Sequence, residues 1–242
     1  MTDLQDNIAS ITPNPVIDLN NAQLSFGEKD KRVDVLKGIN LRIEAGETVG
    51  VLGASGAGKT SLLMVMAGLE NVTGGTIALT DCDITDMAED ALAALRRDKV
   101  GIVFQAFRLI ASMTALQNVS IPLELAGNDD ATARATAALE SVGLGHRLHH
   151  LPDQMSGGEQ QRVAIARAIA PNPRILLADE PTGNLDSTTG EKVIKTLFDS
   201  AANAGAALVL VTHDAGLAAR CSRIIHIEDG KLAADSKQQA TG

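Results

Sequence analysis

The chain has 242 residues, of which 45% are hydrophobic and 21% charged, and this composition predicts a globular protein of one large or two small domains. Its net charge of −9 argues against nucleic-acid binding, because phosphate contacts require Lys and Arg side chains. The two cysteines, Cys82 and Cys221, match no metal-ligand spacing and indicate no disulfide framework, so we expect a reducing compartment.

Both ends of the chain are polar, and residues 1–15 and 232–242 are expected to form flexible tails around a folded domain at 16–231. The first residues lack the basic start and apolar stretch of a signal peptide. No apolar run approaches the roughly 20 residues of a membrane span. The sequence therefore predicts a cytoplasmic protein that reaches the inner face of the cell membrane only through a partner.

Four short apolar runs, each followed by a polar or glycine-rich segment, predict buried parallel strands at Thr48–Leu52, Val100–Phe104, Ile175–Ala178 and Ala207–Val211. Helical stretches alternate with them, which is typical of an α/β sheet. Ligands bind beyond the carboxyl ends of the strands in such sheets, so the four following segments are expected to converge on one site.

Two regions fall outside this alternation. Residues 16–46 alternate in hydrophobicity and carry turn signals, and together with Gly74–Leu79 they predict a small antiparallel sheet. Residues 106–157 are rich in Ala and Leu and have helical periodicity, so they predict an inserted helical subdomain.

Residues 53–60 read Gly-Ala-Ser-Gly-Ala-Gly-Lys-Thr, the pattern of a phosphate-binding loop between a strand and a helix. In this interpretation Lys59 reaches the β- and γ-phosphates and acts in catalysis, while Thr60 binds Mg²⁺. The residues expected to contact the nucleotide here are Gly53, Ala54, Ser55, Gly56, Ala57, Gly58, Lys59, Thr60 and Ser61.

The strand at 175–178 leads into two carboxylates. Asp179 is expected to hold the Mg²⁺ shell, and Glu180 to position and polarise the attacking water as general base. The alternative is a solvated acidic turn stopped by Pro181. The phosphate loop favours the catalytic interpretation.

Residues 155–162 read Met-Ser-Gly-Gly-Glu-Gln-Gln-Arg, in which Ser156 and Glu159 form the capping box of a helix. A helix start that contains Gly157 and Gly158 also offers N–H groups and a hydroxyl to an anion. Because the phosphate loop already holds one triphosphate, these donors are expected to face a nucleotide held by another copy.

Three further candidates have plain alternatives. Gln105 is a candidate ligand of Mg²⁺ or of the attacking water, and otherwise an ordinary turn residue. His213 is a candidate donor to the γ-phosphate, and otherwise a helix cap. Phe26 is a candidate stacking partner for the base, adenine or guanine alike, and otherwise a core aromatic of the small sheet.

Together and in this order, these segments resemble the ABC ATPases over nearly the whole chain, with a D-loop at 184–186. The resemblance implies a P-loop NTPase fold with a RecA-like core, an antiparallel β-subdomain and a helical subdomain. It also implies Mg²⁺-dependent ATP hydrolysis by a head-to-tail dimer, in which a second copy is the expected partner and a paralogue is the alternative. Met155 and Glu159 stand where the family has Leu and Gln, but the capping box turns Glu159 toward the Ser156 backbone, so the site is expected to work.

Finer motifs at 103–110, 114–119, 122–125 and 178–186 resemble the lipoprotein-release, macrolide-efflux and cell-division branch, and YbbA-type members are most similar. This resemblance implies an integral membrane permease on a separate chain, which handles lipid, lipoprotein or other envelope substrates through a pore or by transmitting force. The expected docking residues are Phe107, Leu109, Ile110 and Met113.

Two other classes of protein fit the sequence less well. A soluble ABC ATPase acting on DNA or ribosomes is disfavoured because the chain has one phosphate loop, no long heptad arms and no zinc-binding cysteines. A small P-loop kinase would leave Ser156–Gly158 and His213 without a role.

Overall fold

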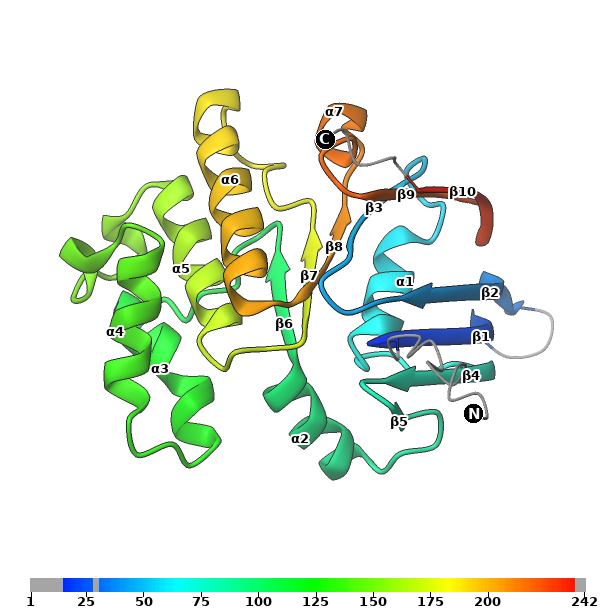
Figure 1. Cartoon of the computed structure of the whole chain (residues 1–242), viewed down its shortest axis with the longest axis horizontal. Coiled ribbons are helices and arrows are strands. Elements are labelled where there is room, and N and C mark those ends of the chain that lie inside the picture. The colour runs from blue at the N-terminus through cyan, green and yellow to red at the C-terminus, as the bar shows by residue number, and fades with distance from the viewer. Residues whose placement is uncertain (1–14, 28–30, 238–242) are drawn as a thin grey trace, which may run out of the picture.

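A six-stranded sheet lies at the centre of the computed structural model, which describes residues 15–27 and 31–237 (Figure 1). The strand order is β10-β9-β3-β8-β7-β6, and all neighbouring pairs are parallel except β10 with β9. The strands are β3 (Thr48–Leu52), β6 (Val100–Phe104), β7 (Ile175–Asp179), β8 (Ala207–Val211), β9 (Arg223–Glu228) and β10 (Lys231–Lys237). The four predicted strands are therefore confirmed.

The carboxyl ends of four parallel strands meet at one edge of this sheet. Val211 of β8 pairs with Val51 of β3 on one side and with Asp179 of β7 on the other. Asp179 in turn pairs with Phe104, the last residue of β6. This register places the segments that follow β3, β6, β7 and β8 side by side, as the sequence predicts.

A four-stranded antiparallel sheet packs beside the central one, with α1 (Lys59–Met66) between them (Figure 1). Its order is β2-β1-β4-β5, from β1 (Ile17–Phe26), β2 (Val33–Ile43), β4 (Gly74–Leu79) and β5 (Cys82–Asp83). One buried cluster joins side chains of both sheets and α1 into a single core. Helix α2 (Glu89–Lys99) then leads into β6.

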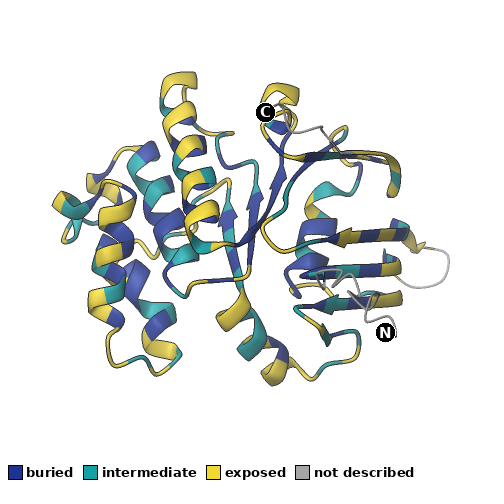
Figure 2. Cartoon of the chain, in the orientation of Figure 1, coloured by how far each residue is buried: buried dark blue, intermediate teal, exposed yellow. Residues whose placement is uncertain are grey.

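Helices form a layer on the other side of the central sheet, and their buried residues belong to one cluster with residues of its strands (Figure 2). They are α3 (Ala115–Leu125), α4 (Ala131–Ser141), α5 (Gly157–Ile169) and α6 (Ser187–Ala204), with 3₁₀ turns η2 (Gly145–Arg147) and η3 (Pro152–Gln154) before α5 and the short α7 (Ala215–Ala218) after β8. The predicted helical segment at 106–157 thus contains α3, α4 and both turns, and α5 extends the layer to residue 169.

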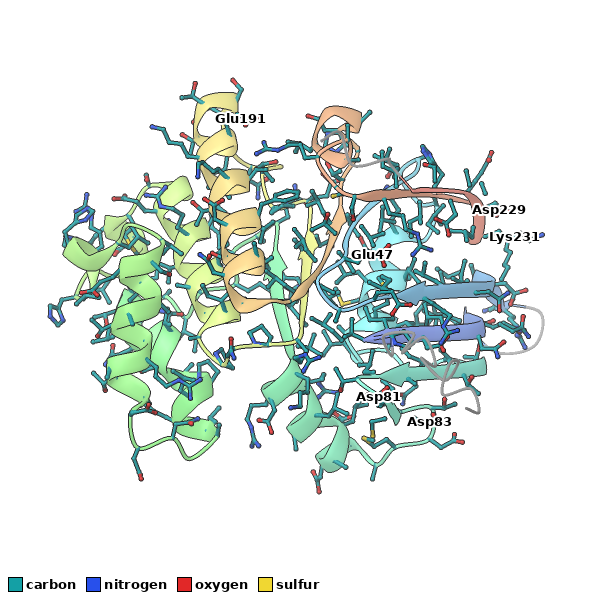
Figure 3. All side chains as sticks on the ribbon, in the orientation of Figure 1. Glu47, Asp81, Asp83, Glu191, Asp229 and Lys231 are labelled. Atoms are coloured by element: carbon teal, nitrogen blue, oxygen red, sulfur yellow. The ribbon has the colours of Figure 1, made fainter. Side chains whose placement is uncertain are left out.

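The predicted C-terminal tail at 232–242 is wrong in its first half, because β10 runs to Lys237 and pairs with β9. Arg223 of β9, which is only 8% exposed, fixes this strand by donating two hydrogen bonds of 2.6 Å to the carboxylate of Asp235. Lys37 of β2 reaches the same hairpin through Asp229, at 2.6 Å, and Figure 3 shows Asp229 beside Lys231 at this turn. The predicted N-terminal tail lies almost entirely outside the described residues.

Candidate functional site

A cavity of about 490 Å³ opens at the edge where the parallel strands end. Its lining combines the helix-start part of the phosphate loop with the residues that follow β6, β7 and β8. The lining residues are Val35, Ser55, Gly56, Gly58, Lys59, Thr60, Ser61, Gln105, Asp179, Glu180, Val211 and His213. The structure therefore brings together most of the predicted nucleotide and metal residues in one place.

The phosphate loop holds its lysine in an inward position. The Lys59 ammonium donates to the carbonyl oxygens of Gly53 and Ala54, at 2.8 and 2.9 Å. Gly58 opens α1 in the left-handed region at φ 101°, and a Cβ there would lie 3.0 Å from the Val35 carbonyl, so this position requires glycine. The loop is also tied to the C-terminal hairpin, because the Gly230 N–H donates to the Ala57 carbonyl at 3.1 Å.

Thr60 and Asp179 face one another across this cavity. The Thr60 hydroxyl lies 3.3 and 3.4 Å from the two carboxylate oxygens of Asp179. Burial raises the pKa of Asp179, and the hydrogen bond from Thr60 acts in the opposite direction. The pair offers hard oxygen donors of the kind that Mg²⁺ prefers.

Glu180 and His213 form a contact pair at the cavity wall. The Nδ1 atom of His213 lies 2.7 Å from Oε2 of Glu180, and the glutamate side chain is 20% exposed while the histidine is 74% exposed. Glu180 has a left-handed backbone at φ 46°, which is strained for a residue with a side chain. Its N–H donates to the Val211 carbonyl and its carbonyl accepts from the Gly183 N–H, and these bonds hold the strained geometry.

Gln105 lies beside the segment that follows β7. Its Nε2 donates to Oδ1 of Asn184 at 3.4 Å, and Nδ2 of Asn184 donates back to the Gln105 carbonyl at 3.1 Å. A Cβ on Gly183 would lie 2.5 Å from the Gln105 amide, so glycine permits this approach. The residue after β6 is thus held against the predicted D-loop.

Ser156, Gly157 and Gly158 do not line the cavity, because they begin α5 in the helical layer. The predicted capping box is present: the Glu159 N–H donates to the Ser156 hydroxyl, and the Glu159 carboxylate accepts from the Ser156 N–H. A Cβ on Gly158 would collide with the Thr189 side chain on α6. The exposed Ser156 hydroxyl therefore lies on a tightly packed helix start.

Arg147 adds a contact to the Ser156–Glu159 capping box, and the sequence does not predict this contact. Its Nε donates to Oε1 of Glu159 at 2.9 Å. The backbone hydrogen bond from Ser156, with the Ser156 hydroxyl and Arg147, lowers the pKa of Glu159 to about 2 despite its burial. The contact joins residues 12 positions apart through the η2 turn, and no local motif signals it.

The low pKa of Glu159 makes the stability of the fold depend on pH within a defined acidic range. The ordinary pKa is 4.5, so the ionised carboxylate stabilises the fold fully above pH 4.5 and loses this effect as the pH falls toward 2. Glu159→Gln removes this titration. The decrease in unfolding free energy between pH 4.5 and 2 should therefore be smaller in the variant than in the wild type, by up to about 3 kcal/mol. Urea titrations between pH 7 and 2 measure this difference, with the exposed Glu140→Gln as matched control. An unchanged pH profile in Glu159→Gln would contradict the assignment.

Phe26 lies at the end of β1 and is 46% exposed, so the alternative that it is a core aromatic is wrong. It does not line the cavity, but it pairs with Val33, and the cavity-lining Val35 lies two residues further along β2. An exposed aromatic ring next to the cavity is a suitable platform for a base.

The chain is similar to known proteins over most of its length. The family profile described as ABC transporter matches residues 36–183. The uncharacterized ABC transporter ATP-binding protein YbbA of Escherichia coli is 45% identical over 90% of this chain and 96% of its own. The lipoprotein-releasing system ATP-binding protein LolD of Geobacter metallireducens is 47% identical over 87% and 94%. The macrolide export ATP-binding/permease protein MacB of Bdellovibrio bacteriovorus is 40% identical over 93% of this chain but 34% of its own length.

A solved structure shows the same fold. The dimeric post-hydrolysis state of the ATP-binding cassette MJ0796, bound to ADP and Pi, superposes with a TM-score of 0.84 at 39% identity, covering 93% of this chain and 99% of that one. The chain therefore belongs to the ABC transporter family, with the P-loop ABC ATPase fold predicted from its sequence. It is an ATP-binding, ATP-hydrolysing subunit of the branch that contains YbbA, LolD and MacB.

None of the helices in the described part of the chain combines the length and the apolar character needed to cross a bilayer.

Proposed function

We propose that the chain works as a homodimer around two ATP molecules, each held between the phosphate loop of one copy and Ser156–Gly158 of the other. The observation that carries this proposal is the separation of two anion-binding elements within one chain. The phosphate loop lines the cavity, whereas the exposed Ser156 hydroxyl and the glycine-rich start of α5 lie outside it. The dimeric, ADP- and Pi-bound relative supports the arrangement.

We assign distinct roles to the polar groups of the cavity. Backbone N–H groups of the phosphate loop and the start of α1 bind the phosphates, and Lys59 exchanges its loop carbonyls for the β- and γ-phosphate oxygens. The Thr60 hydroxyl, Asp179 and the side chain of Gln105 hold Mg²⁺, which neutralises charge on the phosphates when bound. Two or three protein oxygens suffice, since Mg²⁺ keeps several waters and phosphate oxygens.

Glu180 is the general base in this proposal. Its carboxylate lies at the cavity wall, where it can accept a proton from the water that attacks the γ-phosphate. His213 holds the Glu180 carboxylate through its Nδ1 contact and extends from the end of β8 toward the phosphate side. Phe26 stacks on adenine at the outer end of the cavity.

The partner of this ATPase is an integral membrane permease on a separate chain, and the ATPase works at the inner face of the membrane. Two relatives carry names that point to membrane export and lipoprotein release. An apolar groove of about 240 Å³ runs along β6, the strand that ends next to Gln105. Its lining residues are Arg97, Val100, Gly101, Ile102, Ile121, Pro122, Leu125, Arg167 and Ala168. An envelope lipid or lipoprotein is the proposed cargo.

The groove differs from the docking surface predicted from sequence. Ile110 is 39% exposed, but Phe107, Leu109 and Met113 are half-buried, and Leu109 packs on the core of the helical layer. Leu125 is the most exposed apolar residue of the groove, with an exposed fraction of 73%. Arg167, in the groove wall, donates to the carbonyls of Phe107 and Arg108, so a protein seated there would contact the segment after Gln105 indirectly.

Leu125→Asp should remove the permease from the purified complex while leaving ATP hydrolysis by the isolated chain unchanged, because a buried unpaired charge opposes apolar docking. The measurement is affinity purification of the tagged chain from detergent-solubilised native membranes with ATP, followed by mass spectrometry. Ala202→Asp, which adds the same charge at an exposed position of α6, is the control. Recovery of ribosomes or DNA in place of a membrane protein would favour the soluble class of ABC ATPase.

A further inference from the structure

Gln161 lies on α5, five residues after Ser156, and its side chain is fully buried at 0% exposure. Its Nε2 donates to the carbonyl oxygen of Phe104 at 3.3 Å and to that of Pro181 at 2.8 Å. Phe104 directly precedes Gln105, and Pro181 directly follows Glu180. One amide group therefore connects the helix that begins at Ser156 to the backbone beside two residues of the cavity.

The amide oxygen of Gln161 indicates why glutamine is present at this position. Its Oε1 is buried and has no hydrogen-bond partner among the described residues. An unpaired buried acceptor destabilises a fold, and methionine would fill a similar volume without that loss. The two donated hydrogen bonds are therefore the physical reason for an amide at this position.

The hydrogen bond from Gln161 to the Pro181 carbonyl fixes the backbone next to Glu180. Glu180 is held in the left-handed region at φ 46°, and the next residue has a ring-restricted φ and no N–H. A hydrogen bond to the Pro181 carbonyl therefore fixes the chain on the far side of the strained residue. The second bond does the same for the peptide that leads into Gln105.

We propose that Gln161 is a positioning residue that couples the two ATP sites of the dimer. This inference rests on the homodimer proposed above. When Ser156 of one chain contacts the nucleotide held by its partner, the start of α5 shifts. The helix transmits this shift along about 7.5 Å to Gln161. Gln161 then aligns Glu180 and Gln105 of the chain's own site, so contact at one ATP promotes hydrolysis of the other.

Gln161→Met tests the coupling in the full-length chain, because it keeps the volume and removes both donated hydrogen bonds. We expect kcat to fall by about 10–100-fold, the usual effect of a small misplacement of reacting groups. The affinity for ATP should stay unchanged, and the Hill coefficient for hydrolysis should fall toward 1. Gln161→Glu, which replaces the donor NH₂ with an oxygen atom at nearly constant shape, should give the same pattern.

A double-mutant cycle separates positioning from general structural damage. Because Gln161 acts in part through Glu180, Gln161→Met should cause a clearly smaller loss of turnover in a Glu180→Gln background than in the wild type, and what remains is transmitted through Gln105. Multiplied losses would overturn the proposal, as would a wild-type kcat and Hill coefficient in Gln161→Met. If Glu180→Gln itself hydrolyses ATP normally or forms no dimer, the proposed function fails instead.

Asn118 provides the matched control. It is also a fully buried amide, and its Nδ2 donates to the carbonyls of Ile110, Met113 and Thr114 within the helical layer. Asn118→Leu should lower the unfolding free energy but leave the Hill coefficient unchanged and combine multiplicatively with Glu180→Gln. The same cooperativity loss in Asn118→Leu would show that any buried amide gives this effect and would overturn the assignment to Gln161.

Discussion

Glu180→Gln is expected to lower ATP turnover by about 10²–10⁴-fold, the usual share of a general base, while ATP still binds. The amide keeps the shape of the side chain beside His213 but cannot accept a proton from water. Steady-state phosphate release measures turnover, and a fluorescent ATP analogue measures binding. Glu228→Gln, at an exposed position of β9, is the matched control.

The same variant should accumulate as an ATP-bound dimer, because the closed state forms but hydrolysis no longer reopens it. Size-exclusion chromatography coupled to light scattering with and without ATP reports this directly. Adding Ser156→Arg should abolish the dimer while each copy still binds ATP, since the larger side chain occupies the start of α5. A Glu180→Gln protein that hydrolyses ATP at the wild-type rate would rule out Glu180 as the base.

Lys59→Ala is expected to weaken ATP binding by roughly 100-fold or more, since hydrogen bonds to a charged group contribute about 1.5–3 kcal/mol each. The ammonium is already held inside the loop by the Gly53 and Ala54 carbonyls, so the phosphates meet a preformed donor. Isothermal titration calorimetry with ATP measures the loss. Lys195→Ala, at an exposed position of α6, should bind like the wild type, and unaltered affinity in Lys59→Ala would refute the phosphate-loop interpretation.

The central sheet and its catalytic edge were predictable because the signals are local. Each of the four predicted strands is a short apolar run with no exposed residue, and each is followed by a polar residue or a glycine, such as Gly53 or Glu180. Strand β9 was not predicted, because its buried residues alternate with partly or fully exposed ones. The polarity of a parallel sheet then places these ends together without any knowledge of tertiary packing. The pairing of Val211 with both Val51 and Asp179 confirms this argument.

The residues that the sequence did not reveal depend on contacts between distant segments. Arg147 reaches Glu159 only after the η2 turn is folded against α5, and Gln161 meets Phe104 and Pro181 only once α5 lies across two strand ends. Strand β10 has no strong apolar alternation of its own, and Arg223 fixes it through Asp235. Such partners are set by the fold and not by local sequence pattern.

The hydrogen bond from the Gly230 N–H to the Ala57 carbonyl determines when the nucleotide site can be completed during synthesis of this protein. The phosphate loop lies at residues 53–60, whereas the N–H group that supports it belongs to Gly230, which is synthesised 173 residues after Ala57. The Lys37–Asp229 ion pair likewise joins two residues that are 192 positions apart in the sequence. On the ribosome, the phosphate loop of a nascent chain therefore lacks this support until the hairpin turn at Gly230 has also been synthesised.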